Sequence, residues 1–224
     1  MEIVGHRGAK GLAPENTLSS ISKALEYAVD EVEIDVRVSL DGVAILGHGS
    51  KLKDAVGNSL TIPHTNYAEL KQHKGDLTTL DEAMDYTKGK VRLCIEVKRH
   101  VKVKAVATVI KQQIGRGYPA KDLTVASFSL PTLKVFRRLF PDLNLAVNEQ
   151  WSGVLAHYRA KQVDSKRLNM QRRWLWHGYV APLAKRGYRI YGFTINDPRL
   201  ARKMSRYGLA GAITDYPDRF TKHA

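Results

Sequence analysis

Short apolar runs alternate with segments of helical period along most of this chain. The apolar runs are rich in Val, Ile and Leu and are bounded by turn-forming residues, a pattern that predicts strands. They lie near residues 2–5, 31–37, 91–98, 123–127, 143–147, 166–169, 189–194 and 210–214. Alternation of strands with helices is typical of βα units and a largely parallel sheet, and eight units predict a closed barrel.

The segments between these strands carry apolar residues at intervals of three and four. Two sets show it most clearly: Leu18, Ile21, Leu25 and Ala28, after a possible helix cap at Asn16, and Val106, Val109, Ile110 and Ile114. Further helices are predicted near 79–87, 130–139, 174–186 and 198–206. The predicted fold class is therefore α/β, a TIM (β/α)8 barrel.

One insertion interrupts the alternation after the second strand. The apolar run 43–46 follows an Asp41-Gly42 turn, as the second arm of a hairpin would, and leads into a polar stretch ending near Pro63. We expect this small insertion to lie over one mouth of the barrel. Because no linker or low-complexity tract appears, residues 1–224 are predicted to form a single domain.

Composition places the chain among ordinary globular proteins. A hydrophobic fraction of 43% and a charged fraction of 26% argue against a disordered or fibrous chain. Cys94 is the single cysteine, so no internal disulfide is possible, and we interpret it as a core residue. The N-terminus lacks the pattern of a secretory signal and no apolar run is long enough to span a bilayer, so a cytoplasmic location is expected.

The net charge of +14 favours an anionic partner but does not identify it. Nucleic acid, a membrane surface and a phosphorylated substrate are all anionic. The basic residues are spread from Arg7 to Lys222, which disfavours a nucleic-acid-binding protein, since such a protein is expected to concentrate its charge in a stripe.

Acidic residues occupy one face of two predicted strands. Strict alternation over 32–37 puts Glu33, Asp35 and Arg37 on the face opposite to the apolar side chains. In a barrel the apolar face meets the helices, so the carboxylates point inward. Glu96 and Lys98 share a face of the third strand by the same period. Three inward acids predict a cage for one hard divalent cation, Mg²⁺ or Ca²⁺. The alternative is a buried ion network with Arg37, Lys98 or another basic residue.

Two histidines are candidates for proton transfer. His6-Arg7-Gly8 directly follows the first strand, at the face of the barrel where TIM-barrel enzymes have their active sites. His48 follows the hairpin arm and could approach the same mouth, and a histidine is suited to proton transfer near neutral pH. Arg7 offers a planar fork that matches a phosphate. Each residue alone is a weak signal, and their joint occurrence carries the interpretation.

These motifs together resemble the glycerophosphodiester phosphodiesterase family of TIM-barrel phosphodiesterases, which is similar to phosphatidylinositol-specific phospholipase C. The segment from His6 to Thr17 reads His-Arg-Gly-Ala-Lys-Gly-Leu-Ala-Pro-Glu-Asn-Thr, like the opening signature of that family. The signature continues, in the family's order, with Glu33-Ile34-Asp35-Val36, Asp41-Gly42, His48, Ile95-Glu96-Val97-Lys98, Ser127-Phe128, Thr194-Ile195-Asn196 and Thr214-Asp215-Tyr216-Pro217. The resemblance spans nearly the whole chain.

The resemblance implies a role for each of ten residues. It implies a metal held by Glu33, Asp35 and Glu96, catalytic histidines at His6 and His48, substrate contacts from Arg7, Lys98 and Phe193, and support from Glu15 and Asn16. Two positions depart from the family pattern. Gly49 stands where an aspartate usually follows the second histidine, and Phe193 stands where tryptophan is usual.

The implied activity is metal-dependent hydrolysis of glycerophosphodiesters to glycerol 3-phosphate and an alcohol by two-histidine acid/base catalysis. The alternatives are a lysophospholipase D or another phospholipid-headgroup phosphodiesterase, with weak contact to an anionic membrane, and a degenerate barrel that binds without turnover. The segment 148–180 resembles the family least. We interpret its tryptophans as packing residues; they are Trp151, Trp174 and Trp176.

Overall fold

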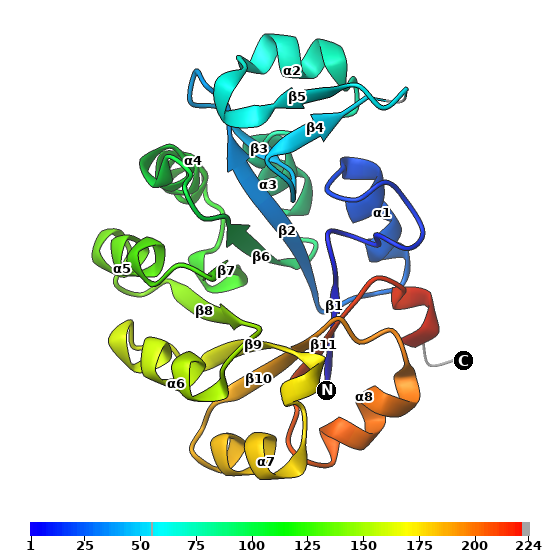
Figure 1. Cartoon of the computed structure of the whole chain (residues 1–224), viewed down its shortest axis with the longest axis vertical. Helices are drawn as coiled ribbons and strands as arrows, with labels where there is room; N and C mark the ends of the chain where they lie inside the picture. The colour runs from blue at the N-terminus through cyan, green and yellow to red at the C-terminus, as the bar shows by residue number, and fades with distance from the viewer. Residues whose placement is uncertain (55, 221–224) are drawn as a thin grey trace.

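Eight parallel strands close into a barrel in the computed structural model, which describes residues 1–54 and 56–220. The strands are β1 (Glu2–Gly5), β2 (Glu31–Val38), β6 (Arg92–Val97), β7 (Leu123–Ser127), β8 (Asn144–Glu149), β9 (Arg167–Gln171), β10 (Arg189–Phe193) and β11 (Gly211–Thr214). Because β1 pairs with both β2 and β11, the ring has no open edge (Figure 1). The predicted TIM barrel is confirmed.

Helices cover the outside of the ring between successive strands (Figure 1). They are α1 (Leu18–Glu26), α3 (Leu80–Thr87), α4 (Val103–Gly115), α5 (Leu130–Leu139), α6 (Gly153–Gln162), α7 (His177–Lys185) and α8 (Pro198–Ser205), with 3-10 turns η2 (Ala120–Asp122), η3 (Arg172–Trp174) and η4 (Pro217–Phe220). Sequence periodicity does not reveal α6, because this helix buries only Gly153, Ala156 and Ala160. Within the described part of the chain, no helix is long and apolar enough to cross a membrane.

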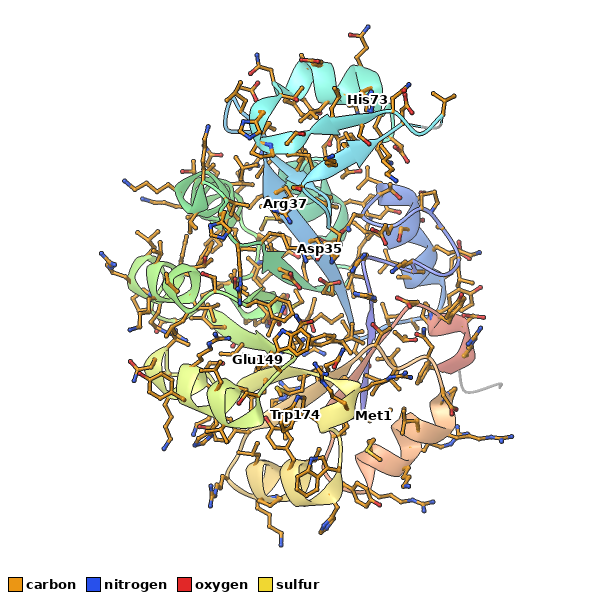
Figure 2. The ribbon with its side chains drawn as sticks, in the orientation of Figure 1. Met1, Asp35, Arg37, His73, Glu149 and Trp174 are labelled. Atoms are coloured by element: carbon orange, nitrogen blue, oxygen red, sulfur yellow. The ribbon has the colours of Figure 1, made fainter. Side chains whose placement is uncertain are left out.

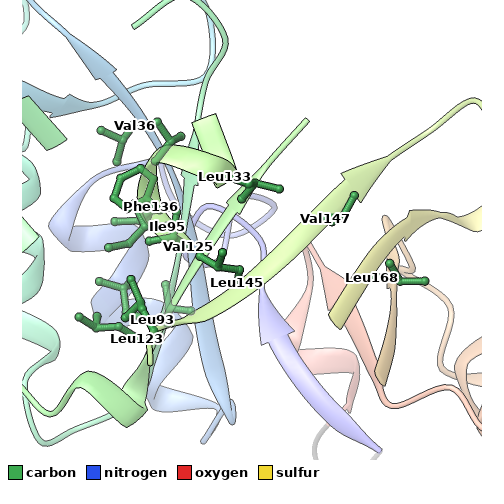
Figure 3. Packing of buried hydrophobic residues seen from close by; sticks show 14 of the residues in the cluster. Val36, Leu93, Ile95, Leu123, Val125, Leu133, Phe136, Leu145, Val147 and Leu168 are labelled. Carbon is green, nitrogen blue, oxygen red and sulfur yellow. The ribbon is translucent and has the colours of Figure 1, made fainter. Parts of the chain in front are cut away.

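The two faces of the barrel strands have opposite character. Val36, Ile95 and Val125 face outward and belong to the same buried core as Leu133 and Phe136 of α5 (Figure 3). The alternate positions, which include the acids of β2 and β6, point into the barrel. Cys94 is fully buried among alanines in that interior, so its interpretation as a core residue is correct.

The insertion after β2 forms a small layer with its own core. It contains β3 (Ala44–Leu46), β4 (Lys51–Lys53), β5 (Ser59–Thr61), η1 (Ile62–His64) and α2 (Tyr67–His73). β3 returns antiparallel to β2 as the hairpin predicted, with Gly42 at a φ of 92° in the turn. The prediction that the insertion lies over the mouth of the barrel is wrong for most of the insertion. Figure 1 shows α2, β4 and β5 at the side of the barrel, and among the described residues of the insertion it is His48 and Ser50 that line the mouth. The physical reason is that its apolar residues, such as Ile45 and Leu70, pack with one another.

Candidate active site

Three buried carboxylates converge inside the barrel at the carboxyl ends of β2 and β6. The strand register places Asp35 beside Glu96, and Glu33 lies two residues earlier on the same face. One oxygen from each of Glu33, Asp35 and Glu96 lies within 4.8 Å of the others. In Figure 2, Asp35 and Arg37 are labelled along β2, with Arg37 nearer to the insertion.

The electrostatics of this acid triad fit a cation. Burial, together with the like charges of Asp35 and Glu96, raises the pKa of Glu33 well above its ordinary value. Burial also raises the pKa of Glu96, although Lys98 opposes the change. These carboxylates are thus destabilised as anions by their surroundings, and all their donor atoms are oxygens. Such a set fits a hard divalent cation.

Basic residues neutralise part of the same cluster. Lys98 Nζ lies 2.5 Å from Asp35 Oδ1 and also pairs with Glu96, while Arg7 Nε lies 3.0 Å from Asp35 Oδ2. Burial raises the pKa of Asp35, but these two cations outweigh it and the pKa falls below its ordinary value. The alternative of a buried ion network therefore describes Asp35. Glu33 accepts the Arg7 backbone N–H at 3.0 Å, but no Lys or Arg side chain among the described residues pairs with it.

His6 is oriented by a carboxylate that the sequence interpretation missed. His6 Nδ1 lies 2.6 Å from Asp215 Oδ1, and His6 Nε2 faces Glu33 Oε2 at 4.0 Å. Asn196 Nδ2 donates to the other Asp215 oxygen at 3.0 Å. Burial raises the pKa of Asp215, yet the hydrogen bonds from His6 and Asn196 outweigh it and lower the value to about 2. The signal for Asp215 was its place directly after the last strand, at the same rim as His6.

His48 reaches the site from the loop between β3 and β4, with less support. Arg37 holds its backbone, since both Nε and Nη2 donate to the His48 carbonyl oxygen at 3.3 and 3.0 Å. Within residues 1–54 and 56–220 no group hydrogen-bonds the His48 ring, and Gly49 offers no carboxylate. Burial, followed by the charge of Lys98, lowers the pKa of His48 to about 4. The ring is neutral at pH 7 and can accept a proton.

The two residues predicted to support the site contact its charged groups. Asn16 makes two hydrogen bonds with Asp35. Asn16 Nδ2 donates to Asp35 Oδ2 at 3.0 Å, and the Asp35 backbone N–H donates to Asn16 Oδ1 at 2.9 Å. Glu15 accepts from Arg7 Nη1 at 3.0 and 2.9 Å. The predicted helix cap at Asn16 is wrong. Thr17 caps α1 instead, because the Asn16 amide is used by Asp35.

A cavity of about 820 Å³ joins these groups at the mouth of the barrel. Of the ten predicted site residues, seven line it: His6, Arg7, Glu33, His48, Glu96, Lys98 and Phe193. Phe193 meets Phe128 edge to face, with ring centroids 6.1 Å apart. Asn148, which sequence reasoning did not select, also lines the cavity and donates to Glu96 Oε2 at 2.9 Å. Its carboxyl-end position on β8 was the available signal.

The tryptophans of segment 148–180 are not all packing residues. Trp174 is partly buried and packs with Tyr179. Trp151 lines the cavity and is 70% exposed, and Trp176 is 56% exposed. The packing interpretation is wrong for these two, because both lie in loops beyond the carboxyl ends of strands rather than against the helical layer.

Comparison with known proteins decides the family. Residues 6–219 match the Glycerophosphoryl diester phosphodiesterase family. The chain belongs to this family. A glycerophosphodiester phosphodiesterase of Bacillus altitudinis is 27% identical, with 99% of this chain and 97% of that relative covered.

Solved structures of the glycerophosphoryl diester phosphodiesterase family share the fold. An Oleispira antarctica phosphodiesterase in complex with the product sn-glycerol-3-phosphate has a TM-score of 0.86 and 28% identity, and the match covers 98% of this chain and 94% of that one. The Thermotoga maritima glycerophosphodiester phosphodiesterase has a TM-score of 0.83 and 26% identity, with 100% and 98% covered. The predicted family and enzyme class are therefore confirmed.

Proposed function

We propose that this phosphodiesterase hydrolyses glycerophosphodiesters to glycerol 3-phosphate and an alcohol, with one divalent cation held by the acid triad. The observation that carries the proposal is the meeting of Glu33, Asp35 and Glu96 with two histidines around one cavity. The product named for the Oleispira antarctica structure supports the substrate class. We further propose that residues 1–224 act as one catalytic domain.

Two basic residues beside the acid triad bind the phosphate. A divalent ion held by the triad would supply further positive charge for the phosphoryl oxygens. Arg7 and Lys98 lie beside the triad at the cavity wall and present donors to the same oxygens. Both are positioned by acids, Arg7 by Glu15 and Lys98 by Glu96. Fixed donors of this kind stabilise the charge that develops on phosphoryl oxygens during the reaction.

The two histidines divide the proton transfers. His48, neutral at pH 7, accepts the proton of the nucleophile, which is either water or the free hydroxyl of the glycerol moiety. His6 donates a proton to the departing alkoxide, and the ionised Asp215 beside Nδ1 fixes the orientation of the ring. Each transfer is typically worth about 10² to 10⁴ in rate. Phe193 packs against the glycerol backbone beside them.

The test is an assay of the purified chain on glycerophosphocholine, with release of glycerol 3-phosphate as the readout. Chelation should abolish turnover, and adding back Mg²⁺ or Ca²⁺ should restore it. His6→Ala and His48→Ala should each lose most of the activity, while exposed His64→Ala, in the insertion, serves as the matched control. Turnover that persists in chelator would reject the metal site. Tight substrate binding without turnover would favour the degenerate barrel.

The same assay addresses the phospholipase alternative. Comparing glycerophosphocholine with lysophosphatidylcholine under equal conditions measures whether an acyl chain is needed. We expect the deacylated substrate to be preferred, because the cavity beside the triad is lined mainly by charged and polar side chains.

A further inference from the structure

Exposed apolar side chains concentrate on one part of the surface. Nine large hydrophobic residues are exposed in the described part of the chain, and five of them fall within 151–176. We define this rim surface as Trp151, Val154, Leu155, Tyr158 and Trp176. Val154 is 82% exposed, although an apolar side chain so open to water contributes nothing to the fold. A gathering of such residues in one place marks an interaction site more often than chance.

The rim surface surrounds one side of the active-site opening. Helix α6 follows β8 and α7 follows β9, so the first turns of both helices lie at the carboxyl ends of the strands, where the cavity opens (Figure 1). The two loops are joined, because Arg173 Nε donates to the Gln150 carbonyl oxygen at 2.8 Å and Trp174 Nε1 donates to it at 3.3 Å. Buried Glu149 accepts the backbone N–H of Trp151 at 2.8 Å. The apolar residues are thus held on a rigid support.

Positive charge accompanies the apolar residues. Arg172 and Arg173 are exposed in the loop between β9 and α7, and the Arg173 guanidinium lies 4.6 Å from the Trp151 ring centre. Across the cavity, Arg99 and His100 are exposed as well. Exposed Trp and Tyr mixed with Arg are characteristic of protein surfaces at the interface between water and lipid headgroups.

We propose that the rim surface docks on an anionic lipid bilayer and turns the active-site opening toward the headgroups. This inference rests on the proposed function only where it treats the cavity as the catalytic site, because lipid binding is measured independently of turnover. A protein partner or a second copy seated on the rim would cover the opening. A headgroup layer leaves access from the bilayer surface, and the apolar side chains insert between headgroups while the guanidinium groups pair with lipid phosphates.

The experiment measures co-sedimentation of the full chain with phosphatidylcholine vesicles, with and without phosphatidylglycerol. Wild type should bind the anionic vesicles and be released as salt increases. Val154→Ser combined with Trp176→Ser should weaken binding about tenfold. Arg172→Gln, which leaves the Arg173 contacts with Gln150 and Trp151 in place, should weaken binding about fivefold, and on anionic vesicles only. Val56→Ser, at a site 84% exposed in the insertion, is the matched control and should bind as wild type.

Several results would overturn the docking surface. The proposal fails if wild type does not bind anionic vesicles, if the Val154→Ser, Trp176→Ser variant binds them as well as wild type, or if the Val56→Ser control loses binding equally. Self-association that depends on concentration and is lost with the same two substitutions would point to a second copy. Binding to duplex DNA in place of vesicles would point to nucleic acid. Thermal unfolding and turnover of soluble glycerophosphocholine should be unchanged in the variant, which separates docking from folding. If wild type binds vesicles but has no turnover, the proposed function fails and the docking surface stands.

Discussion

Replacing Asp215 with asparagine tests whether the His6–Asp215 pair is part of the machinery. Asn keeps the size of the side chain and the Asn196 contact, but it removes the negative charge 2.6 Å from His6 Nδ1. The His6 ring then loses the charged acceptor that orients it. We expect kcat on glycerophosphocholine to fall at least about 10²-fold.

The stability change follows from the pKa of Asp215, which is about 2 against an ordinary 3.8. A difference of nearly two pH units corresponds to about 2 kcal/mol, and the side chain is only 18% exposed, so solvent screens little of it. Because the folded-state pKa is depressed, this contribution is present above the unfolded pKa and is lost as pH falls through the folded one. Asp215→Asn should therefore lose up to about 2 kcal/mol of unfolding free energy near pH 7 and much less near pH 2.

Urea unfolding from about pH 7 down to about pH 2, alongside steady-state kinetics, measures both effects. Exposed Asp142→Asn is the control for the loss of a carboxylate elsewhere. A variant that keeps near-wild-type kcat while losing the expected stability would show that Asp215 is structural only. Unchanged stability at every pH would refute the electrostatic reasoning itself.

Four further outcomes follow from the same site. Glu33→Gln should raise the melting temperature of metal-free protein. The substitution removes a carboxylate that is destabilised as an anion by burial and by the like charges beside it. With divalent ion present, wild type should instead melt at the higher temperature. For the same reason, metal-free wild type should lose stability as pH rises above the ordinary pKa of a glutamate, because the raised pKa of Glu33 favours folding only while this carboxyl is protonated; calorimetry in chelator measures both. His48→Gln should reduce turnover about 10² to 10⁴-fold, and the acidic limb of kcat/KM, near pH 4 in wild type, should disappear from the pH profile. Asn148→Ala should weaken divalent-ion binding about 10 to 100-fold in titration calorimetry, because Glu96 loses the donor that orients it.

Local patterning predicted much of the site because strand geometry has a strict period. The alternation in β2 alone placed Glu33 and Asp35 inward, and the structure shows them there. A residue that directly follows a barrel strand, such as His6, lies at the rim formed by the carboxyl ends of the strands. The same reasoning could have selected Asp215, whose position after β11 is equivalent.

Other features were beyond sequence reasoning because they depend on contacts between distant segments. The cap at Asn16 was mispredicted, since its amide is used 19 residues away by Asp35. Helix α6 packs through glycine and alanine, which leave no apolar stripe to detect. The exposure of Trp151 and Trp176 depends on how two loops meet at the rim, and composition alone suggested packing.

The sequence by itself determined the barrel, the family and the inward direction of the acids. Alternation along a strand decides which side chains face the barrel interior, and a residue that directly follows a strand must lie at the carboxyl end of the barrel. Only the tertiary structure decided which charges meet. Whether a buried carboxylate is neutralised, as Asp35 is by Lys98, or left to favour a cation, as Glu33 is, depends on separations of a few ångströms between strands. Electrostatic energies inside a protein change steeply over such distances, and no local pattern encodes them.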